Sequence, residues 1–193
     1  GTVGATPKRV LAAQQAIRDE IEREPSRHML RELTSIRVGG PRSDVPRMRR
    51  AAAEVAAFVN ARPDDLVFVD NATTGASAVL RSLKLEPGDE ILMSDLAYGA
   101  VANSAKFVAR EAGASVVTVA APYPLPDGPE PFVEAVIAAL TPRTKLLIVE
   151  HITSESALIL PVAEIVRRAR ERRVPVFVDG AHAPGSIPLD IPS

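Results

Sequence analysis

Residues 174–185 read VPVFVDGAHAPG, and this stretch determines how the rest of the chain is interpreted. It begins with a short apolar run rich in β-branched residues, which is typical of a buried strand. The run ends in Asp179, and His182 follows after Gly180 and Ala181. An ionised carboxylate at the end of a buried strand is costly unless it is paired, so we expect a cation to face Asp179. A helix N-terminus, an arginine or a protonated heterocyclic ligand would each satisfy it.

Four further runs lack the alternation of apolar and polar residues that marks a half-exposed strand. They are LVFVD at 66–70, EILMS at 90–94, SVVTVA at 115–120 and KLLIVE at 145–150. Segments of helical period separate the five runs, at 74–85, 100–112, 130–140 and 162–172. The alternation predicts an α/β fold, a three-layer sandwich in which helices cover both faces of a mainly parallel sheet.

Two more helices are predicted before the first run, at 7–24 and 43–60. We expect residues 1–42 to form an N-terminal helical arm and residues 43–193 to belong to one large α/β domain. The chain starts without a methionine and stops just after a strand-and-turn pattern, so we expect it to be a fragment of a longer fold.

The composition is that of a globular domain, with 46% hydrophobic and 24% charged residues. A formal net charge of −1 gives no global reason to expect nucleic acid as a partner. No apolar stretch reaches the roughly 18 residues of a membrane helix. The absence of cysteine excludes disulfides, thiolate metal sites and a cysteine nucleophile within this stretch, and it fits a cytoplasmic enzyme.

Ligands of parallel sheets gather at the carboxyl ends of the strands, so the residues after each run carry most weight. NATTGAS at 71–77 opens a helix with small and hydroxyl residues, which suits a phosphate, although Thr73 or Thr74 could simply cap the helix. The segment is neither GxxxxGK[ST] nor GxGxxG, which weakens nucleoside triphosphate and nicotinamide dinucleotide interpretations.

Tyr98 follows the run at 90–94, where its ring could stack on a planar ligand or pack at a helix start. His151 and Ser154 follow the run at 145–150 and could face a ligand or form a turn. The histidines have no metal-binding spacing, so we expect no metal site. A phosphate site, a ring platform and a carboxylate for a ring nitrogen together suit pyridoxal 5′-phosphate (PLP).

Four motifs in order resemble the class V aminotransferase-like, fold type I PLP enzymes, in particular the isopenicillin N epimerase-like branch. They are NATTGAS at 71–77, DLAYGAV at 95–101, HITSESALILPV at 151–162 and VDGAHAPGSIPLD at 178–190. The opening GTVGATPKRV at 1–10 is also similar to that branch. The resemblance implies the large PLP-binding domain of such an enzyme.

The resemblance also implies roles for individual residues. Thr73 and Thr74 would hold the cofactor phosphate, aided by the helix start at Gly75. Tyr98 would stack on the pyridine ring, and Ser154 would lie near its phenolic oxygen.

Two residues of the last motif would take part in catalysis as well as in cofactor binding. Asp179 would pair with the pyridinium nitrogen and so stabilise charge released at Cα. His182 would lie near the ring substituents.

One element of the family pattern is missing, because no lysine matches the position of the Schiff-base lysine. The four lysines are Lys8, Lys84, Lys106 and Lys145. We expect the catalytic lysine on a C-terminal half outside this chain. The alternative is a noncatalytic module that binds a phosphorylated ligand.

The implied activity is PLP chemistry on an amino-acid substrate, through an external aldimine and a Cα carbanion. Epimerisation, carbon–sulfur lyase and aminotransferase outcomes all stay open. Relatives are homodimers with active sites at the subunit interface, so a homodimer is implied too. Arg27, Arg37 and Arg42 are expected to form solvated salt bridges rather than to bind substrate.

Overall fold

The computed structural model describes residues 4–29, 45–122 and 128–191. Contacts divide the chain into two compact units, one of Gly1–Phe68 with Pro188–Ser193 and one of Val69–Ile187. The boundary expected between residues 42 and 43 lies outside the described residues and stays a prediction. None of the helices in the described ranges is long and apolar enough to cross a membrane.

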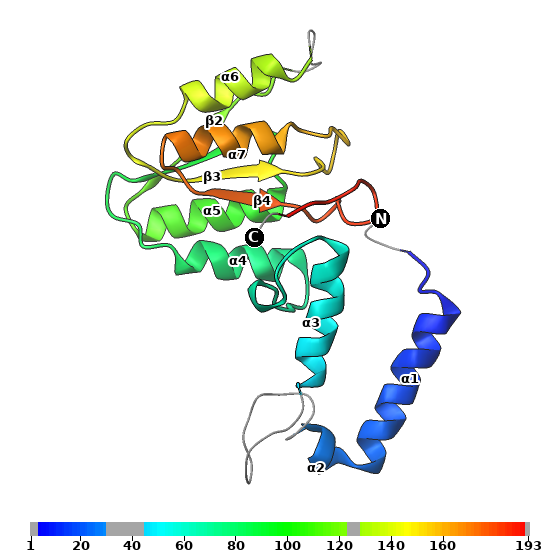
Figure 1. The fold of residues 1–193 in the computed structure, drawn as a ribbon. Coiled ribbons are helices and arrows are strands. Elements are labelled where there is room, and N and C mark those ends of the chain that lie inside the picture. Colours follow the sequence, from blue (N-terminus) through cyan, green and yellow to red (C-terminus); the bar gives the residue numbers. More distant parts are fainter. Residues whose placement is uncertain (1–3, 30–44, 123–127, 192–193) are drawn as a thin grey trace. The chain divides into compact units, whose positions relative to one another are not determined.

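The unit Val69–Ile187 contains a four-stranded sheet in the order β2-β1-β3-β4, in which all neighbouring strands are parallel. Figure 1 shows β3 and β4 side by side and pointing the same way. The strands are β1 (Glu90–Ser94), β2 (Ser115–Val119), β3 (Thr144–Glu150) and β4 (Val176–Asp179). The helices are α4 (Ala72–Ser82), α5 (Gly99–Glu111), α6 (Glu130–Ala138) and α7 (Val162–Glu171). These elements agree with the predicted ones to within a few residues at their ends, so the α/β prediction is confirmed.

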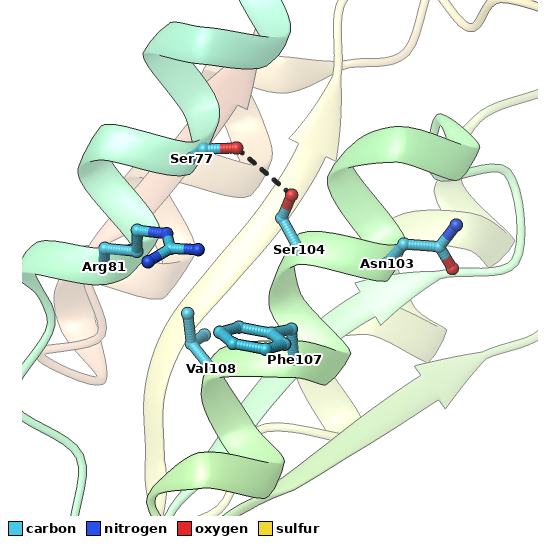
Figure 2. Close-up of a pocket in the computed structure, with 6 residues that line it drawn as sticks. All are labelled: Ser77, Arg81, Asn103, Ser104, Phe107 and Val108. Atoms are coloured by element: carbon cyan, nitrogen blue, oxygen red, sulfur yellow. Dashed lines mark hydrogen bonds between the residues drawn. The ribbon is translucent and has the colours of Figure 1, made fainter.

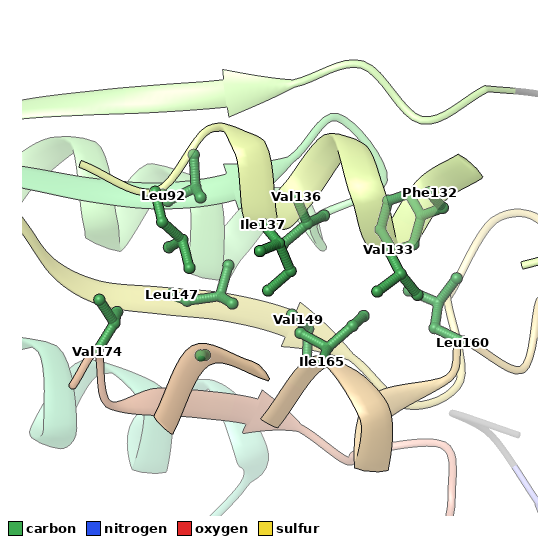
Figure 3. Close-up of a cluster of buried hydrophobic side chains, with 12 residues drawn as sticks. Leu92, Phe132, Val133, Val136, Ile137, Leu147, Val149, Leu160, Ile165 and Val174 are labelled. Carbon is green, nitrogen blue, oxygen red and sulfur yellow. The ribbon is translucent and has the colours of Figure 1, made fainter. Parts of the chain in front are cut away.

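Helices cover both faces of this sheet. Leu147 and Val149 of β3 pack with α6 and α7, as Figure 3 shows. Leu146 and Ile148, the alternate residues of the same strand, pack with α4 and α5 on the other face. The central strands β1 and β3 are therefore buried on both sides, which explains why their sequences do not alternate. The outer strands β2 and β4 are only partly buried.

The strand predicted at 66–70 is wrong. These residues lie outside any strand, and Val67, Phe68 and Val69 are 75%, 45% and 48% exposed. Composition indicates that a segment suits a strand, but a strand forms only when a neighbour pairs with its backbone. Within the described part of the chain no such neighbour lies beside this segment.

The other unit is built mainly of helices, as its amphipathic patterns predict. Its described elements are α1 (Lys8–Arg23), α2 (Pro25–Arg27), α3 (Arg47–Phe58) and the short 3-10 helix η2 (Pro63–Asp65). Arg27 pairs with Glu24 at 3.1 Å with both side chains exposed, which is the solvated salt bridge expected of it. Arg37 and Arg42 lie outside the described residues.

Candidate functional site

Two carboxylates lie side by side where β3 and β4 end. In the parallel ladder Glu150 pairs with Asp179, and the N–H of His151 donates to the Asp179 carbonyl at 2.8 Å. Ile148 and Phe177 are a pair in the same ladder and both face α4 and α5. Because side chains alternate along a strand, Glu150 and Asp179 project from this same face, on strands about 4.8 Å apart.

Asp179 is half-buried, and its Oδ1 accepts a hydrogen bond from the N–H of Ala181 at 3.2 Å. No Lys or Arg among the described residues lies within salt-bridge distance of it. The arginine partner that would have given Asp179 a purely structural role is therefore not found in this part of the chain.

Glu150 is buried more deeply, with 2% of its surface exposed. The Ser94 hydroxyl donates to its Oε2 at 3.4 Å, whereas Oε1 is buried without a hydrogen-bond partner among the described residues. Burial raises the pKa of the Glu150 carboxyl to about 7, and the negative charge of Asp179 acts in the same direction. Hydrogen bonds from the backbone N–H groups of Glu150 and Tyr98 and from Ser94 partly oppose the rise in pKa.

Sequence reasoning missed Glu150. The signal was present, because Glu150 is a carboxylate at the end of an apolar run, as Asp179 is. Glu150 lies outside the Asp-x-x-His motif, so the motif did not point to it. Its burial depends on neighbouring elements and cannot be read from its own segment.

The first turn of α4 carries the predicted phosphate-binding residues. Asn71 is the N-cap, and its side chain accepts a hydrogen bond from the Thr74 N–H at 2.8 Å. The interpretation of Thr73 or Thr74 as the cap is therefore wrong, because Asn71, which precedes them, already fills that position. Thr73 is half-buried and Thr74 exposed, just inside a helix end whose first N–H groups have no intrahelical partner.

Helices α4 and α5 run side by side in the same direction. Ser77 bonds to Ser104 at 3.2 Å, and one turn further along both helices Arg81 lies over the ring of Phe107 at 5.2 Å (Figure 2). Their N-terminal ends are therefore level with each other. Because α5 follows β1 directly, both ends lie at the carboxyl edge of the sheet.

This arrangement brings Thr73, Thr74 and Gly75 to the same edge as Tyr98, which precedes α5 and is 46% exposed. It also brings them to the edge where Glu150 and Asp179 end their strands. Further along α4 and α5, a hollow of about 220 Å³ is lined by Ser77, Arg81, Asn103, Ser104, Phe107 and Val108 (Figure 2). None of the predicted site residues lines that hollow.

Ser154 and His182 also follow strands that end at this edge. Ser154 is half-buried in the loop after β3, which Thr153 holds by accepting a hydrogen bond from the Leu158 N–H at 2.8 Å. His182 is exposed in the turn after β4, where the Ala183 N–H donates to the Gly180 carbonyl at 3.0 Å. Within the described residues, neither side chain has a hydrogen bond to Asp179.

The three lysines of the unit Val69–Ile187 lie away from this edge of its sheet. Lys145 is at the opposite end of β3 and pairs with Asp89 at 3.5 Å. Lys84 follows the C-terminal end of α4, Lys106 lies beyond the first turns of α5, and Lys8 begins α1. In the ranges that the structure describes, no group of three or more His, Asp or Glu is arranged to hold a metal ion.

Comparison with known proteins places these features in a family context. The model of the family described as aminotransferase class-V matches residues 42–193. Isopenicillin N epimerase of Streptomyces clavuligerus is 33% identical, over 99% of this chain and 45% of that protein. L-cysteine desulfhydrase of Arabidopsis thaliana is 32% identical, over 99% of this chain and 43% of that protein.

A solved structure is similar as well. It is the enzyme C-DES, described as a cystine C–S lyase, in a mutant form with glycine covalently linked to its PLP cofactor. The TM-score is 0.76 and the identity 27%, over 95% of this chain and 46% of that one. The chain therefore spans less than half the length of the relatives it matches.

Proposed function

The chain belongs to the class-V aminotransferase family, and on this premise we propose that it is part of a PLP-dependent enzyme acting at Cα of an amino-acid substrate. Relatives of this chain named as an epimerase and a desulfhydrase support such an activity, as does a similar structure that contains PLP. The observation that carries the proposal is Asp179, a carboxylate without a Lys or Arg partner among the described residues, at the edge where α4 and α5 begin.

The residues at this edge fit PLP in their chemistry. Thr73 and Thr74 offer hydroxyl donors beside the free N–H groups and positive dipole end of α4, which suits a phosphate. The exposed ring of Tyr98 offers a face for stacking. The negative charge of Asp179 suits a protonated ring nitrogen, and Asp179 lies at the end of β4 beside Glu150 of β3.

When bound, PLP supplies an electron sink for the charge that develops at Cα of an amino acid. In this proposal Asp179 keeps the proton on the ring nitrogen, which maintains the sink. Tyr98 covers one ring face and excludes water from it. Ser154 and His182 orient the ring substituents from the loops after β3 and β4.

The finer reaction is proposed as epimerase-like, carbon–sulfur lyase or aminotransferase chemistry. An epimerase, a cysteine desulfhydrase and a cystine C–S lyase among the similar proteins support the first two. We also propose that the Schiff-base lysine lies outside residues 1–193, because Lys84, Lys106 and Lys145 lie away from the candidate site. We further propose that the full-length protein is a homodimer with the site at the subunit interface. This part of the proposal rests on the family resemblance.

The test uses the full-length protein, purified with and without added PLP. We expect the visible absorbance of a Schiff base between PLP and a lysine, covalent fixation of the cofactor to the protein on borohydride reduction, and turnover of an amino acid. Sulfide release from cysteine detects a lyase, exchange of the Cα proton in D₂O with loss of chirality detects an epimerase, and keto-acid formation detects an aminotransferase.

A site variant and a control variant test whether turnover depends on Asp179. Asp179→Asn should lower turnover by at least about 10²-fold, the scale seen when an electrostatic partner of a reacting group is removed. Glu111→Gln, a change at the exposed C-terminal end of α5, away from the carboxyl edge of the sheet, should leave turnover intact. PLP binding without reducible linkage or turnover would favour the noncatalytic alternative, and no PLP binding would contradict both.

A further inference from the structure

Glu150 joins three parts of the candidate site. Its Oε2 accepts from the Ser94 hydroxyl at 3.4 Å, and Ser94 Oγ accepts from the Leu96 N–H at 3.2 Å. Ser94 therefore connects the turn between β1 and α5 to the end of β3. The Tyr98 N–H in the same turn lowers the pKa of the Glu150 carboxyl. On its other side Glu150 adjoins Asp179 in the β3–β4 ladder.

The charged and titratable groups around Glu150 leave it without a cation among the described residues. Asp179 faces it from β4, and His151 follows it in the chain. Tyr98 and Asp95 belong to the turn after β1, and Asp95 Oδ1 already accepts from the Ala121 N–H at 2.8 Å. A carboxyl that is buried beside another carboxylate avoids ionisation, which agrees with its pKa of about 7.

A cation at Asp179 would change this balance. It would cancel the negative charge that opposes ionisation of Glu150, and it would attract the Glu150 carboxylate from the neighbouring strand. The buried Oε1, which has no hydrogen-bond partner in the described part of the chain, would then be compensated by charge.

We propose that Glu150 is a positioning residue whose carboxyl keeps a proton while the site is empty and releases it to solvent when a cationic heterocycle comes to face Asp179. The released proton leaves a carboxylate, so both carboxylates attract the ring nitrogen, and that of Glu150 holds the turn after β1 against β3 through Ser94. This inference rests on the proposed function for the identity of the cation. The protonation of Glu150 in the cofactor-free protein does not depend on it.

The first experiment addresses the cofactor-free, full-length protein. Carboxyl titration is followed by ¹³C NMR in the wild type, in Glu150→Gln and in the control Glu155→Gln, which changes an exposed carboxylate of the loop after β3. We expect one carboxyl that titrates near neutral pH, present in the wild type and the control and absent from Glu150→Gln. If Glu150 titrates in the range of the exposed glutamates, the proposal is overturned.

The second experiment measures proton release on PLP binding, by calorimetry in two buffers that differ in protonation enthalpy. Protons from PLP itself cancel when the wild type is compared with Glu150→Gln. At about pH 6, where Glu150 is mostly protonated, the wild type should release up to about one proton more than the variant. At about pH 8 the difference should vanish, because Glu150 is then already ionised.

The two experiments separate the inference from the proposed function. Equal proton release by both proteins at every pH, with PLP bound, overturns the release step while leaving the PLP assignment intact. If PLP does not bind at all, the proposed function and the release step both fail, and the first experiment still decides whether Glu150 holds a proton.

Discussion

Replacing Glu150 with Gln in the cofactor-free, full-length protein should change how the free energy of unfolding depends on pH. The pKa of Glu150 is raised from 4.5 to about 7, chiefly by burial. A carboxyl whose folded pKa lies above its unfolded pKa contributes stability that is fully present below about pH 4.5. This contribution is lost progressively as the pH rises to about 7 and stays lost above it.

The magnitude follows from the two pKa values. The interval from 4.5 to about 7, at about 1.4 kcal/mol for each pH unit, corresponds to about 3.5 kcal/mol in total, most of it between about pH 4 and pH 8. Gln has nearly the same shape and does not ionise, so it lacks this pH dependence. The advantage of Glu150→Gln over the wild type should therefore grow by roughly 3 kcal/mol between about pH 4 and pH 8.

Urea unfolding at several pH values measures this difference directly. Comparing how the free energy of unfolding changes with pH removes any constant offset caused by the altered hydrogen bond to Ser94. Glu155→Gln should follow the wild-type curve to within a few tenths of a kcal/mol, as expected for an exposed site. Parallel curves for the wild type and Glu150→Gln across this range would refute the reasoning that burial governs the Glu150 carboxyl.

Asp179→Asn should lower the titration midpoint of Glu150 in the ¹³C experiment, because it removes the adjacent negative charge; an unchanged midpoint would mean that the two carboxyls do not interact. Asn71→Ala should destabilise the protein to urea by about 1 kcal/mol through loss of the α4 cap, whereas Asn71→Asp should retain most of the stability; equal losses would contradict a capping role. Phe132→Ala should cost about 3–5 kcal/mol in urea unfolding because the ring is 1% exposed, with the 48% exposed Val10→Ala as a nearly neutral control; a loss below about 1 kcal/mol would place Phe132 outside the core.

The secondary structure could be predicted from sequence for segments whose apolar pattern matches their burial in the fold. The segment at 90–94 reads as a two-sided buried strand, and β1 occupies the same residues. The segment at 66–70 has an equally strong composition but forms no strand in the structure. The difference is whether a neighbour pairs with its backbone, which no local pattern can reveal.

Some residues of the candidate site could be found from a local sequence motif, whereas others could be found only from the three-dimensional structure. Asp179 and its position at a strand end could be read from the chain because its motif is contiguous. The sequence did not single out Glu150 as a site residue. Its burial and its bond to Ser94 depend on how β1, β3 and β4 pack together, which no local pattern shows. The sequence also offered Thr73 or Thr74 as an alternative cap of α4, whereas the structure has Asn71, because Asn and Thr both favour helix starts.

The uncovered segment at Val67, Phe68 and Val69 has a practical consequence for anyone who expresses these 193 residues alone. Contiguous β-branched and aromatic side chains without a charge act as a template on which other copies assemble into intermolecular sheets. The isolated piece should therefore precipitate at high concentration. A single gatekeeper change such as Val67→Lys should delay this precipitation, since an added charge opposes stacking of identical segments.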